Sequence, residues 1–371
     1  MRIAFLCKRR YMGKDVILDR YARLYEIPFQ LARLGHEVRG YCFSYQGHED
    51  GQWQHDALPG KLDWESRSPG RLYLPALLGY PGCLLRRLRD YAPDLLIGAS
   101  DIPHVALCAS LARRLGVPYA ADLYDNFEGF GQARIPGMVG ALRHAVRHAS
   151  LVTTTSEPLK DLVTDSYRAC GEVMAMPSTA DRKVFRAMDR ATCRRALGLP
   201  MNARLVGTAG GLYQDKGVGA LYEAWQTIAA QDQGAHLVLA GPFDPGFPPP
   251  ADERVHYIGQ LPHSRTAELF NALDVGVIYL RDTPFGRYCF PQKAYEMLAC
   301  DLPIASARVG VMPHLLASTP AGLYQPDDPG DLARAVLNQL ARPEVARVPI
   351  NDWAEVIGAM ERRLRAIVAR S

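Results

Sequence analysis

Short runs of consecutive apolar residues alternate with longer stretches in which apolar residues recur every three or four positions along most of this 371-residue chain. Runs that are apolar throughout are typical of strands buried on both faces, as in parallel sheets covered by helices. The pattern therefore predicts an α/β fold made of parallel βαβ units. In the first half we expect strands at 3–7, 38–43, 95–98, 119–122 and 151–154, and helices at 19–34 and 105–115.

A second set of apolar runs begins after a break at Pro177-Ser178-Thr179. Its expected strands lie at 205–208, 236–240, 255–258, 275–280 and 304–306. Because a typical domain has about 150 residues, the length allows two domains, each with its own core. We predict domains over 1–178 and 179–350, followed by a helix over 351–371 that packs back on the N-terminal domain through one apolar face.

Two segments lack this alternation. The stretch 46–82 is rich in Gly, Pro, Trp and His, which favours a long loop or insertion. The stretch 242–250 is rich in proline and is expected to be a surface connection.

Composition and charge exclude several classes of protein. The chain is 48% hydrophobic and 22% charged, with a mean hydropathy of -0.12, as in ordinary folded proteins. Its net charge of +4 argues against nucleic acid as the main ligand. No run reaches the roughly 18 to 20 apolar residues of a membrane span. The eight cysteines are scattered without a C-x-x-C pair, as in reduced cytosolic thiols, so we expect a cytoplasmic protein.

Clusters of basic residues make contact with a membrane surface an open alternative. Several basic clusters lie in the first half, and the apolar run 135–142 precedes Arg143 and Arg147. This pattern is compatible with a helix at the surface of an inner membrane and equally with a packed helix. A solvated surface is the commoner explanation of such clusters.

Five motifs follow one another in the second half, in an order that is hard to obtain by chance. They lie at 210–217, 236–242, 257–262, 269–275 and 290–304. Together with Gly35-His36-Glu37-Val38 and the linker 177–185, they resemble the retaining GT-B glycosyltransferases of glycosyltransferase family four, over nearly the whole chain. The resemblance implies two Rossmann-like domains facing a central cleft. The N-terminal domain would bind the acceptor, and the C-terminal domain the nucleotide-sugar donor.

One group of donor residues lies in a glycine-rich turn. The pyrophosphate of a nucleotide diphosphate sugar is anionic, and cations or helix N-termini stabilise the leaving phosphate. Gly210 and Gly211 allow close backbone approach, and the ammonium of Lys216 can meet the phosphates. An ordinary strand-to-helix turn with a solvated lysine is the alternative.

A second group of donor residues opens a helix. Pro291 suits the first helical turn, where its missing N–H costs nothing and the next N–H groups can face an anion. Gln292 and Lys293 lie at the same helix start, and the resemblance assigns the ribose hydroxyls to Glu296, just over one turn further on. The alternative is an exposed helical pair of Glu296 and Lys293.

Further candidates occupy positions that match the family elsewhere. The backbone of Gln260 and Leu261 matches the position that contacts the base edge. In the first domain, Gly13 lies in the loop that approaches the donor phosphate in the family. Asp125 is a candidate for the sugar or acceptor site, and a turn-forming role is the alternative.

Three positions depart from the family pattern. Tyr288 stands eight residues before Glu296, where many relatives have a second glutamate. Gly211 stands where an arginine often precedes the lysine, and Arg287 or Arg281 is a candidate substitute. In the first domain, the run beginning at Asp122 replaces a common His-Asp pair.

The resulting hypothesis is a metal-independent retaining hexosyltransferase, in which Lys216, Glu296 and Asp125 carry the catalysis. It would move a sugar from a nucleotide diphosphate sugar to a glycan or lipid-linked acceptor in bacterial surface polysaccharide or lipopolysaccharide assembly, with no cofactor besides the donor. In the mechanism that the resemblance implies, the leaving phosphate assists the incoming hydroxyl, and no protein nucleophile takes part. The alternatives are a non-catalytic protein of the same fold and a nucleotide-sugar epimerase. The base, sugar, acceptor, linkage and oligomeric state stay open.

Overall fold

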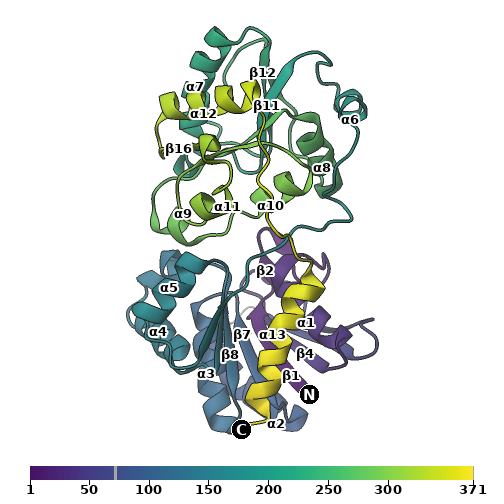
Figure 1. Cartoon of the computed structure of the whole chain (residues 1–371). Coiled ribbons are helices and arrows are strands. Elements are labelled where there is room, and N and C mark those ends of the chain that lie inside the picture. The colour runs from purple at the N-terminus through teal and green to yellow at the C-terminus, as the bar shows by residue number, and fades with distance from the viewer. Residues whose placement is uncertain (71–72, 371) are drawn as a thin grey trace. The chain divides into compact units, whose positions relative to one another are not determined.

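The computed structural model describes residues 1–70 and 73–370. The chain divides into two compact units, each with its own mainly parallel sheet (Figure 1). Unit 1 comprises residues 1–178 together with the segment from Trp353 onward, and unit 2 comprises Thr179–Asp352. The predicted α/β class with two parallel sheets is therefore confirmed.

Unit 1 is built on an eight-stranded sheet in the order β10-β9-β8-β7-β1-β4-β6-β5. Every neighbouring pair is parallel except β5 and β6, which form an antiparallel edge. The chain passes from β1 to one side through β4 and β6, and then to the other side through β7, so the strand order reverses between β1 and β7. The bounds are β1 Arg2–Lys8, β4 Glu37–Phe43, β5 Gly51–His55, β6 Lys61–Arg67, β7 Leu95–Ala99, β8 Tyr119–Leu123, β9 Leu151–Thr154 and β10 Glu172–Ala175.

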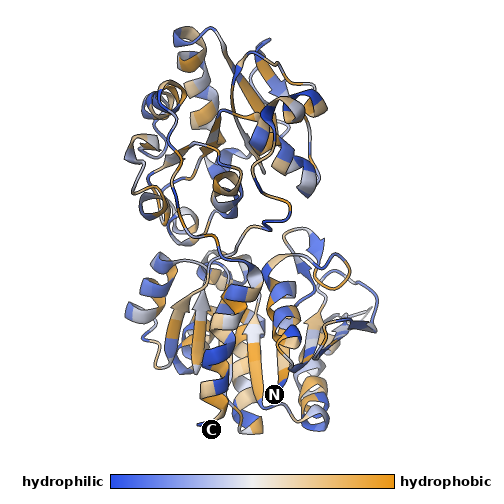
Figure 2. Ribbon diagram, turned by 45° about the vertical axis from the view of Figure 1, so that its right-hand side comes forward, coloured by the Kyte–Doolittle hydropathy of each residue, from blue (hydrophilic) through white to orange (hydrophobic). Residues whose placement is uncertain are grey.

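Helices and a small hairpin connect these strands. The helices are α1 Ala22–Arg33, α2 Tyr73–Tyr91, α3 Ile102–Leu115, α4 Met138–His148, α5 Glu157–Asp165 and α13 Trp353–Val368, with 3-10 turns at Phe127–Gly129 and Gly131–Arg134. The hairpin pairs β2 (Arg10–Tyr11) with β3 (Lys14–Asp15). In Figure 2 the strands at the centre of the unit 1 sheet are coloured as hydrophobic, in agreement with their burial.

The last helix, α13, packs on unit 1 beside α1 (Figure 1). Its apolar face places Ile357, Met360 and Leu364 in the unit 1 core. A buried polar contact adds specificity, because His36 Nε2 lies 2.8 Å from Glu361 Oε1. The apolar period of the last 20 residues therefore forms the expected helix, and residue 371 lies outside the described part.

The expectation of a long loop over 46–82 is wrong. This segment contains β5, β6 and the start of α2, and its residues 71 and 72 lie outside the described part. Trp64 of β6 is 1% exposed, and a Cβ added at Gly40 of β4 would lie 2.2 Å from its ring. The apolar pattern did not reveal these strands because polar residues alternate with Trp53 in β5 and with Leu62 and Trp64 in β6.

The apolar run 135–142 leads into α4, which buries Leu142, Ala145 and Val146 within unit 1. Its exposed Arg143 pairs with Glu128 at 2.7 Å. Leu142 therefore packs within unit 1, whereas Ile135 at the start of the run is 52% exposed. Over residues 1–70 and 73–370, no helix has both the length and the apolar character needed to cross a membrane.

Unit 2 contains a six-stranded parallel sheet in the order β13-β12-β11-β14-β15-β16. The strands are β11 Arg204–Ala209, β12 Ala235–Ala240, β13 Val255–Tyr257, β14 Val275–Ile278, β15 Ile304–Ala307 and β16 Leu323–Tyr324. The helices are α6 Arg190–Leu197, α7 Val218–Gln231, α8 His263–Ala272, α9 Pro284–Tyr288, α10 Gln292–Ala299, α11 Met312–Leu315 and α12 Pro329–Ala341, with 3-10 turns at Gln214–Lys216 and Pro320–Gly322.

Successive residues of β11 point to opposite faces of this sheet. Leu205 lies in one core with Phe270 of α8 and Met297 of α10. Val206 lies in the other core with Trp225 of α7. Burial on both faces explains why the strands of unit 2 are apolar throughout.

Candidate functional site

Two glycine loops touch at the carboxyl edge of the unit 2 sheet. Gly210 follows β11, Gly241 follows β12, and both have a left-handed φ, +120° and +127°. A Cβ at Gly241 would lie 2.0 Å from the carbonyl oxygen of Gly210, so only glycine allows this approach. The backbone of the first predicted donor turn is thereby held in a fixed position.

The side chain of Lys293, from α10, lies close to this turn. Its Nζ lies 3.5 Å from the position of a Cβ added at Gly210 and 5.0 Å from the ring centroid of Tyr279. Tyr279 Oη donates a hydrogen bond to the carbonyl oxygen of Gly211 at 2.8 Å. Lys293 and Gly210 were predicted as donor-site residues, and the structure places them side by side. Sequence reasoning missed Tyr279, a buried polar aromatic residue just beyond β14.

Two lysines come close enough here to influence each other. Burial and, to a lesser extent, the positive charge of Lys216 together lower the pKa of Lys293 to about 8, and the charge of Glu296 opposes this shift. Lys216 itself is exposed at the end of the 3-10 turn Gln214–Lys216. An anion bound beside both ammonium groups would relieve their repulsion and favour the charged form of Lys293.

Glu296 lies one turn after Gln292 on the same helix and is 9% exposed. Gln292 Nε2 donates to Glu296 Oε1 at 3.0 Å. Burial raises the pKa of Glu296 to about 7, and the hydrogen bond from Gln292 and the charge of Lys293 oppose the shift. We call Lys216, Lys293 and Glu296 the lysine cluster.

The start of α10 differs slightly from the expectation. Pro291 is the residue before the helix rather than part of its first turn, since α10 begins at Gln292. Pro291, the N-cap residue, makes no side-chain hydrogen bond to this end of the helix. The first N–H groups of α10 lie next to the lysine cluster and can face an anion.

The loop after β13 joins the same edge. The N–H of Gly241 donates to the carbonyl oxygen of Gly259 at 2.9 Å, and Gln260 and Leu261 follow directly. The structure thus brings the predicted segments at Gly210, Gln260 and Lys293 to one edge of one sheet.

The two candidate replacements for the missing arginine differ in position. Arg281 lies against the turn after Lys216, because a Cβ at Gly217 would be 2.9 Å from its Cγ, and its Nε pairs with Asp327 at 3.3 Å. Arg287 is exposed and pairs with Asp282 at 2.5 Å. Tyr288 is the last residue of the short helix α9.

The candidates of the first domain lie in unit 1. Asp125 follows β8, its Oδ1 accepts the N–H of Asn126 at 2.7 Å, and burial raises its pKa to about 6 against the influence of that bond and of Lys8. Gly13 forms the tip of the β2–β3 hairpin with a φ of +80°. The hairpin packs near Asp125, since the rings of Tyr11 and Tyr124 are 4.7 Å apart.

Sequence reasoning missed the residues that follow β1 and β7 at the same edge. Lys8 ends β1, and its Nζ donates to Tyr124 Oη at 3.0 Å. Asp101 caps α3 after β7 and lies 2.6 Å from the ring of His104. The only signal in the sequence was position, since Lys8 ends one buried parallel strand and Asp101 lies two residues after another.

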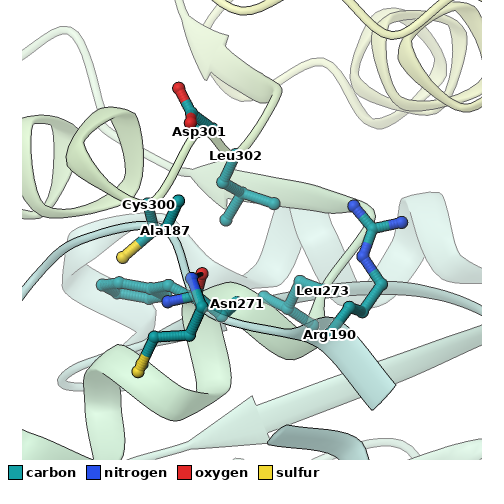
Figure 3. Close-up of a pocket in the computed structure, with 9 residues that line it drawn as sticks. Ala187, Arg190, Asn271, Leu273, Cys300, Asp301 and Leu302 are labelled. Carbon is teal, nitrogen blue, oxygen red and sulfur yellow. Dashed lines mark hydrogen bonds between the residues drawn. The ribbon is translucent and has the colours of Figure 1, made fainter. Parts of the chain in front are cut away.

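A separate pocket of about 380 Å³ lies at the opposite, amino-terminal edge of β14 and β15 (Figure 3). It is lined by Ala187, Met188, Arg190, Phe270, Asn271, Leu273, Cys300, Asp301 and Leu302. Asn271 Nδ2 donates to the carbonyl oxygen of Arg186, and Arg190 pairs with Asp274. The pocket contains none of the predicted site residues.

Two family models match the chain. Residues 203–342 match the model described as glycosyl transferases group 1. Residues 23–179 match the model described as a glycosyl transferase 4-like domain. The matches cover most of unit 2 and most of unit 1, respectively.

The similar curated proteins are bacterial glycosyltransferases. TuaC of Bacillus subtilis, described as a candidate teichuronic acid biosynthesis glycosyltransferase, is 25% identical over 78% of this chain and 72% of its own length. D-inositol 3-phosphate glycosyltransferases of Saccharomonospora viridis and Stackebrandtia nassauensis are 27% and 28% identical over 53% and 60% of this chain. The matches span about half of these two relatives, 49% and 51%.

Solved structures resemble the chain over its whole length. Sucrose-phosphate synthase of Thermosynechococcus elongatus superposes with a TM-score of 0.70 at 19% identity, covering 100% of both chains. HepE of Anabaena, solved with UDP and glucose, gives a TM-score of 0.69 at 18% identity, covering 99% of this chain and 100% of its own. At these identities the similarity shows a shared fold.

Proposed function

We propose that this chain, which belongs to the group 1 glycosyl transferases of family four type, moves a hexose from a nucleotide diphosphate sugar to a glycan or lipid-linked acceptor. Its two parallel-sheet units have the GT-B fold. We further propose that the reaction retains the anomeric configuration, needs no metal ion, and serves bacterial surface polysaccharide or lipopolysaccharide assembly.

The observation that carries this proposal is the lysine cluster beside the glycine loops of unit 2. A diphosphate bound there would receive charge from Lys216 and Lys293 while the neighbouring glycines let its oxygens approach the backbone. As the anomeric bond breaks, negative charge grows on the leaving phosphate. Cations already in place stabilise that charge without rearranging.

The remaining predicted residues take supporting roles in this proposal. Glu296 accepts hydrogen bonds from the ribose hydroxyls, Gln292 holds its carboxylate, and the backbone of Gln260 and Leu261 contacts the base. Of the residues of unit 1, Gly13 keeps its predicted role toward the donor phosphate, and Asp125 its predicted role toward the sugar or acceptor. The incoming hydroxyl loses its proton to the leaving phosphate, so no protein nucleophile is required.

The relatives support the setting and suggest the first nucleotide to test. TuaC is named for teichuronic acid biosynthesis, which fits assembly of a bacterial surface polymer. HepE was solved with UDP, which makes UDP the first candidate. We place the reaction at the cytoplasmic face of the inner membrane, where a lipid-linked acceptor would be available.

A thermal-shift panel with UDP, GDP, ADP and CMP in the presence of EDTA tests the proposal. A ligand that binds only the folded protein raises its Tm, so one diphosphate should give a clear rise without metal. Lys216→Ala and Lys293→Ala should remove the rise, whereas Lys183→Ala, which changes an exposed lysine elsewhere in unit 2, should keep it. No rise with any nucleotide, together with no binding in calorimetry, would contradict nucleotide-sugar transfer.

A further inference from the structure

Two lysine–tyrosine pairs lie at the glycine turn of unit 2. Lys293 Nζ lies 5.0 Å from the ring centroid of Tyr279, and Lys216 Nζ lies 5.4 Å from that of Tyr213. An ammonium within about 6 Å of a ring centroid is attracted by the negative face of the ring. Each lysine of the lysine cluster therefore has an aromatic partner.

Tyr279 also fixes the backbone of this turn. Its Oη donates to the carbonyl oxygen of Gly211 at 2.8 Å, and the N–H of Leu212 donates to the carbonyl oxygen of Pro242 at 2.8 Å. The C=O of Gly211 and the N–H of Leu212 belong to one planar peptide unit. Hydrogen bonds at both ends of that unit hold its orientation, and loss of either one would free it to tilt.

Tyr213 contacts the same glycine through its ring. A Cβ added at Gly211 would lie 2.6 Å from Cδ2 of Tyr213, well inside van der Waals contact. The ring thus fills the space that a side chain at position 211 would need. An arginine at this position, as in the family pattern, would displace the ring.

The hydroxyl of Tyr279 is buried and paired. Tyr279 is 4% exposed and packs in a core of unit 2 with Leu212 and Val218. Burial raises its pKa, so the hydroxyl keeps its proton and can donate. Phenylalanine would fill the same core without a polar group, and a buried hydroxyl costs free energy unless it is paired. The hydrogen bond to Gly211 is therefore what the hydroxyl adds at this position.

Lys293 is buried, so its charge depends more on its surroundings than that of exposed Lys216. Burial, and to a lesser extent the charge of Lys216, lower the pKa of Lys293 to about 8. The charges of Glu296 and Cys289 oppose this shift. The ring face of Tyr279 also favours the charged form, because it attracts the ammonium and not the neutral amine. Without the ring, Lys293 should lose its proton at lower pH.

We propose that Tyr279 is a positioning residue for the donor diphosphate. Its hydroxyl orients the peptide unit between Gly211 and Leu212, and its ring holds the Lys293 ammonium beside the same turn. Tyr213 acts on Lys216 through its ring alone. The inference rests on the proposed function, because these groups serve a diphosphate only if unit 2 binds one.

Two substitutions at Tyr279 separate its hydroxyl from its ring. The probes are the diphosphate among UDP, GDP and ADP that raises the Tm, and the monophosphate of the same base. Tyr279→Phe removes the hydrogen bond to Gly211 and should weaken diphosphate binding about three- to tenfold in calorimetry. Affinity for the monophosphate should change less, because it lacks the second phosphate that the turn would contact.

Tyr222→Phe is the matched control, since it makes the same change on α7 in the same core. Within residues 1–70 and 73–370, Tyr222 Oη has no hydrogen-bond partner. Both affinities should therefore stay at wild-type values in this variant. Wild-type affinity for the diphosphate in Tyr279→Phe, or an equal loss in Tyr222→Phe, would overturn the role of the hydroxyl.

The ring is tested by the titration of Lys293 in the ligand-free protein, followed by NMR of ¹³C-labelled lysine. Lys293→Arg assigns the signal, and Tyr279→Met is the alternative if Tyr279→Leu does not fold. Tyr279→Leu should lower the pH at which Lys293 loses its proton by roughly 0.5 to 1 unit, whereas Tyr279→Phe should not. A merely structural loss of packing would let water reach the ammonium and raise this pH. An unchanged or higher titration pH in Tyr279→Leu would overturn the role of the ring.

The wild-type nucleotide response separates this inference from the proposed function. No binding of any diphosphate by the wild-type protein would contradict nucleotide-sugar transfer, and with it the positioning role, whatever the titration of Lys293 shows. Diphosphate binding that stays at wild-type strength in Tyr279→Phe and Tyr279→Leu would overturn this inference alone. Weaker diphosphate binding in both variants, with the lower titration pH in Tyr279→Leu, is the expected result.

Discussion

The two units share a parallel-sheet architecture but differ in the charges at their carboxyl edges. In unit 2, Lys216 and Lys293 lie beside glycine loops, with one buried carboxylate, Glu296, nearby. In unit 1, Lys8, Asp101 and Asp125 lie at the ends of three adjacent strands, and Asp101 lies 2.6 Å from the ring of His104. The first arrangement suits an anionic diphosphate, whereas the second mixes carboxylates with basic groups.

The difference shows that the loops after the strands, not the sheet, determine the ligand. Both sheets bring strand ends that are distant in sequence to one edge. Which charges meet there depends on one or two residues after each strand. Changes confined to one edge should therefore affect one kind of ligand.

The largest expected effect concerns the antiparallel pair β5–β6 at one edge of the unit 1 sheet. Trp64→Ala removes a fully buried ring that contacts Phe5 and Tyr25, so the free energy of unfolding should fall by about 3–5 kcal/mol. Urea unfolding measures this loss. Trp53→Ala, a half-buried tryptophan on neighbouring β5, is the matched control and should cost less. An equally small effect for both variants would mean that this segment behaves as a loop.

The next effect is on catalysis. Lys293→Ala removes a cation beside the glycine loops and should lower the rate of transfer about 10²- to 10³-fold, as loss of a preorganised transition-state contact does. Initial rates with the identified donor measure it, and Lys183→Ala should keep the wild-type rate. A rate near wild type in Lys293→Ala would exclude this lysine from the reaction.

A third prediction concerns pH. Glu296 has a pKa of about 7 and must lose its proton to accept ribose hydroxyls, so nucleotide affinity should fall below that pH. Lys293 has a pKa of about 8 and must keep its proton to bind phosphate, so affinity should also fall above that pH. Calorimetry across this pH range measures the fall in nucleotide affinity on both sides.

The variant Glu296→Gln tests whether Glu296 causes the fall in nucleotide affinity at low pH. The amide cannot titrate, so the fall in affinity toward low pH should disappear. At the pH of tightest binding, affinity should drop about tenfold, because a hydrogen bond to a charged group is lost. If affinity still falls at low pH in Glu296→Gln, another residue causes that fall.

The smallest effects distinguish the two arginines. Arg281 packs against the turn after Lys216, so Arg281→Ala should weaken nucleotide binding several-fold. Arg287 forms an exposed pair with Asp282, and Arg287→Ala should change binding by less than about twofold. The reverse order in calorimetry would make Arg287 the replacement for the missing arginine.

Much of the fold follows from the apolar pattern because most strands are buried on both faces. The central strands β1, β7, β8, β11 and β12 form where uninterrupted apolar runs occur. The edge strand β5 and its neighbour β6 could not be found in this way, since polar residues alternate with apolar ones in both and Gly and Pro interrupt the segment. Trp64 was therefore assigned to a loop although it is a core residue.

The candidate site of unit 2 was accessible to sequence reasoning because its residues lie in local motifs. Lys216 follows a glycine turn, and Lys293 and Glu296 share one helix. In unit 1 the sequence indicated Asp125 but not Lys8, Ser100 or Asp101, because these residues meet only in the folded sheet. Lys8 and Ser100 are joined by a hydrogen bond across 92 residues of chain, and no local spacing encodes that contact.

The central claim is that unit 2 binds a diphosphate through paired cations. The most direct measurement is calorimetry in EDTA with the nucleoside diphosphate that raises the Tm and with the monophosphate of the same base. We expect the diphosphate to bind at least about tenfold more tightly, and Lys293→Ala to reduce that ratio. Equal affinity for the two nucleotides, or an unchanged ratio in Lys293→Ala, would contradict the claim.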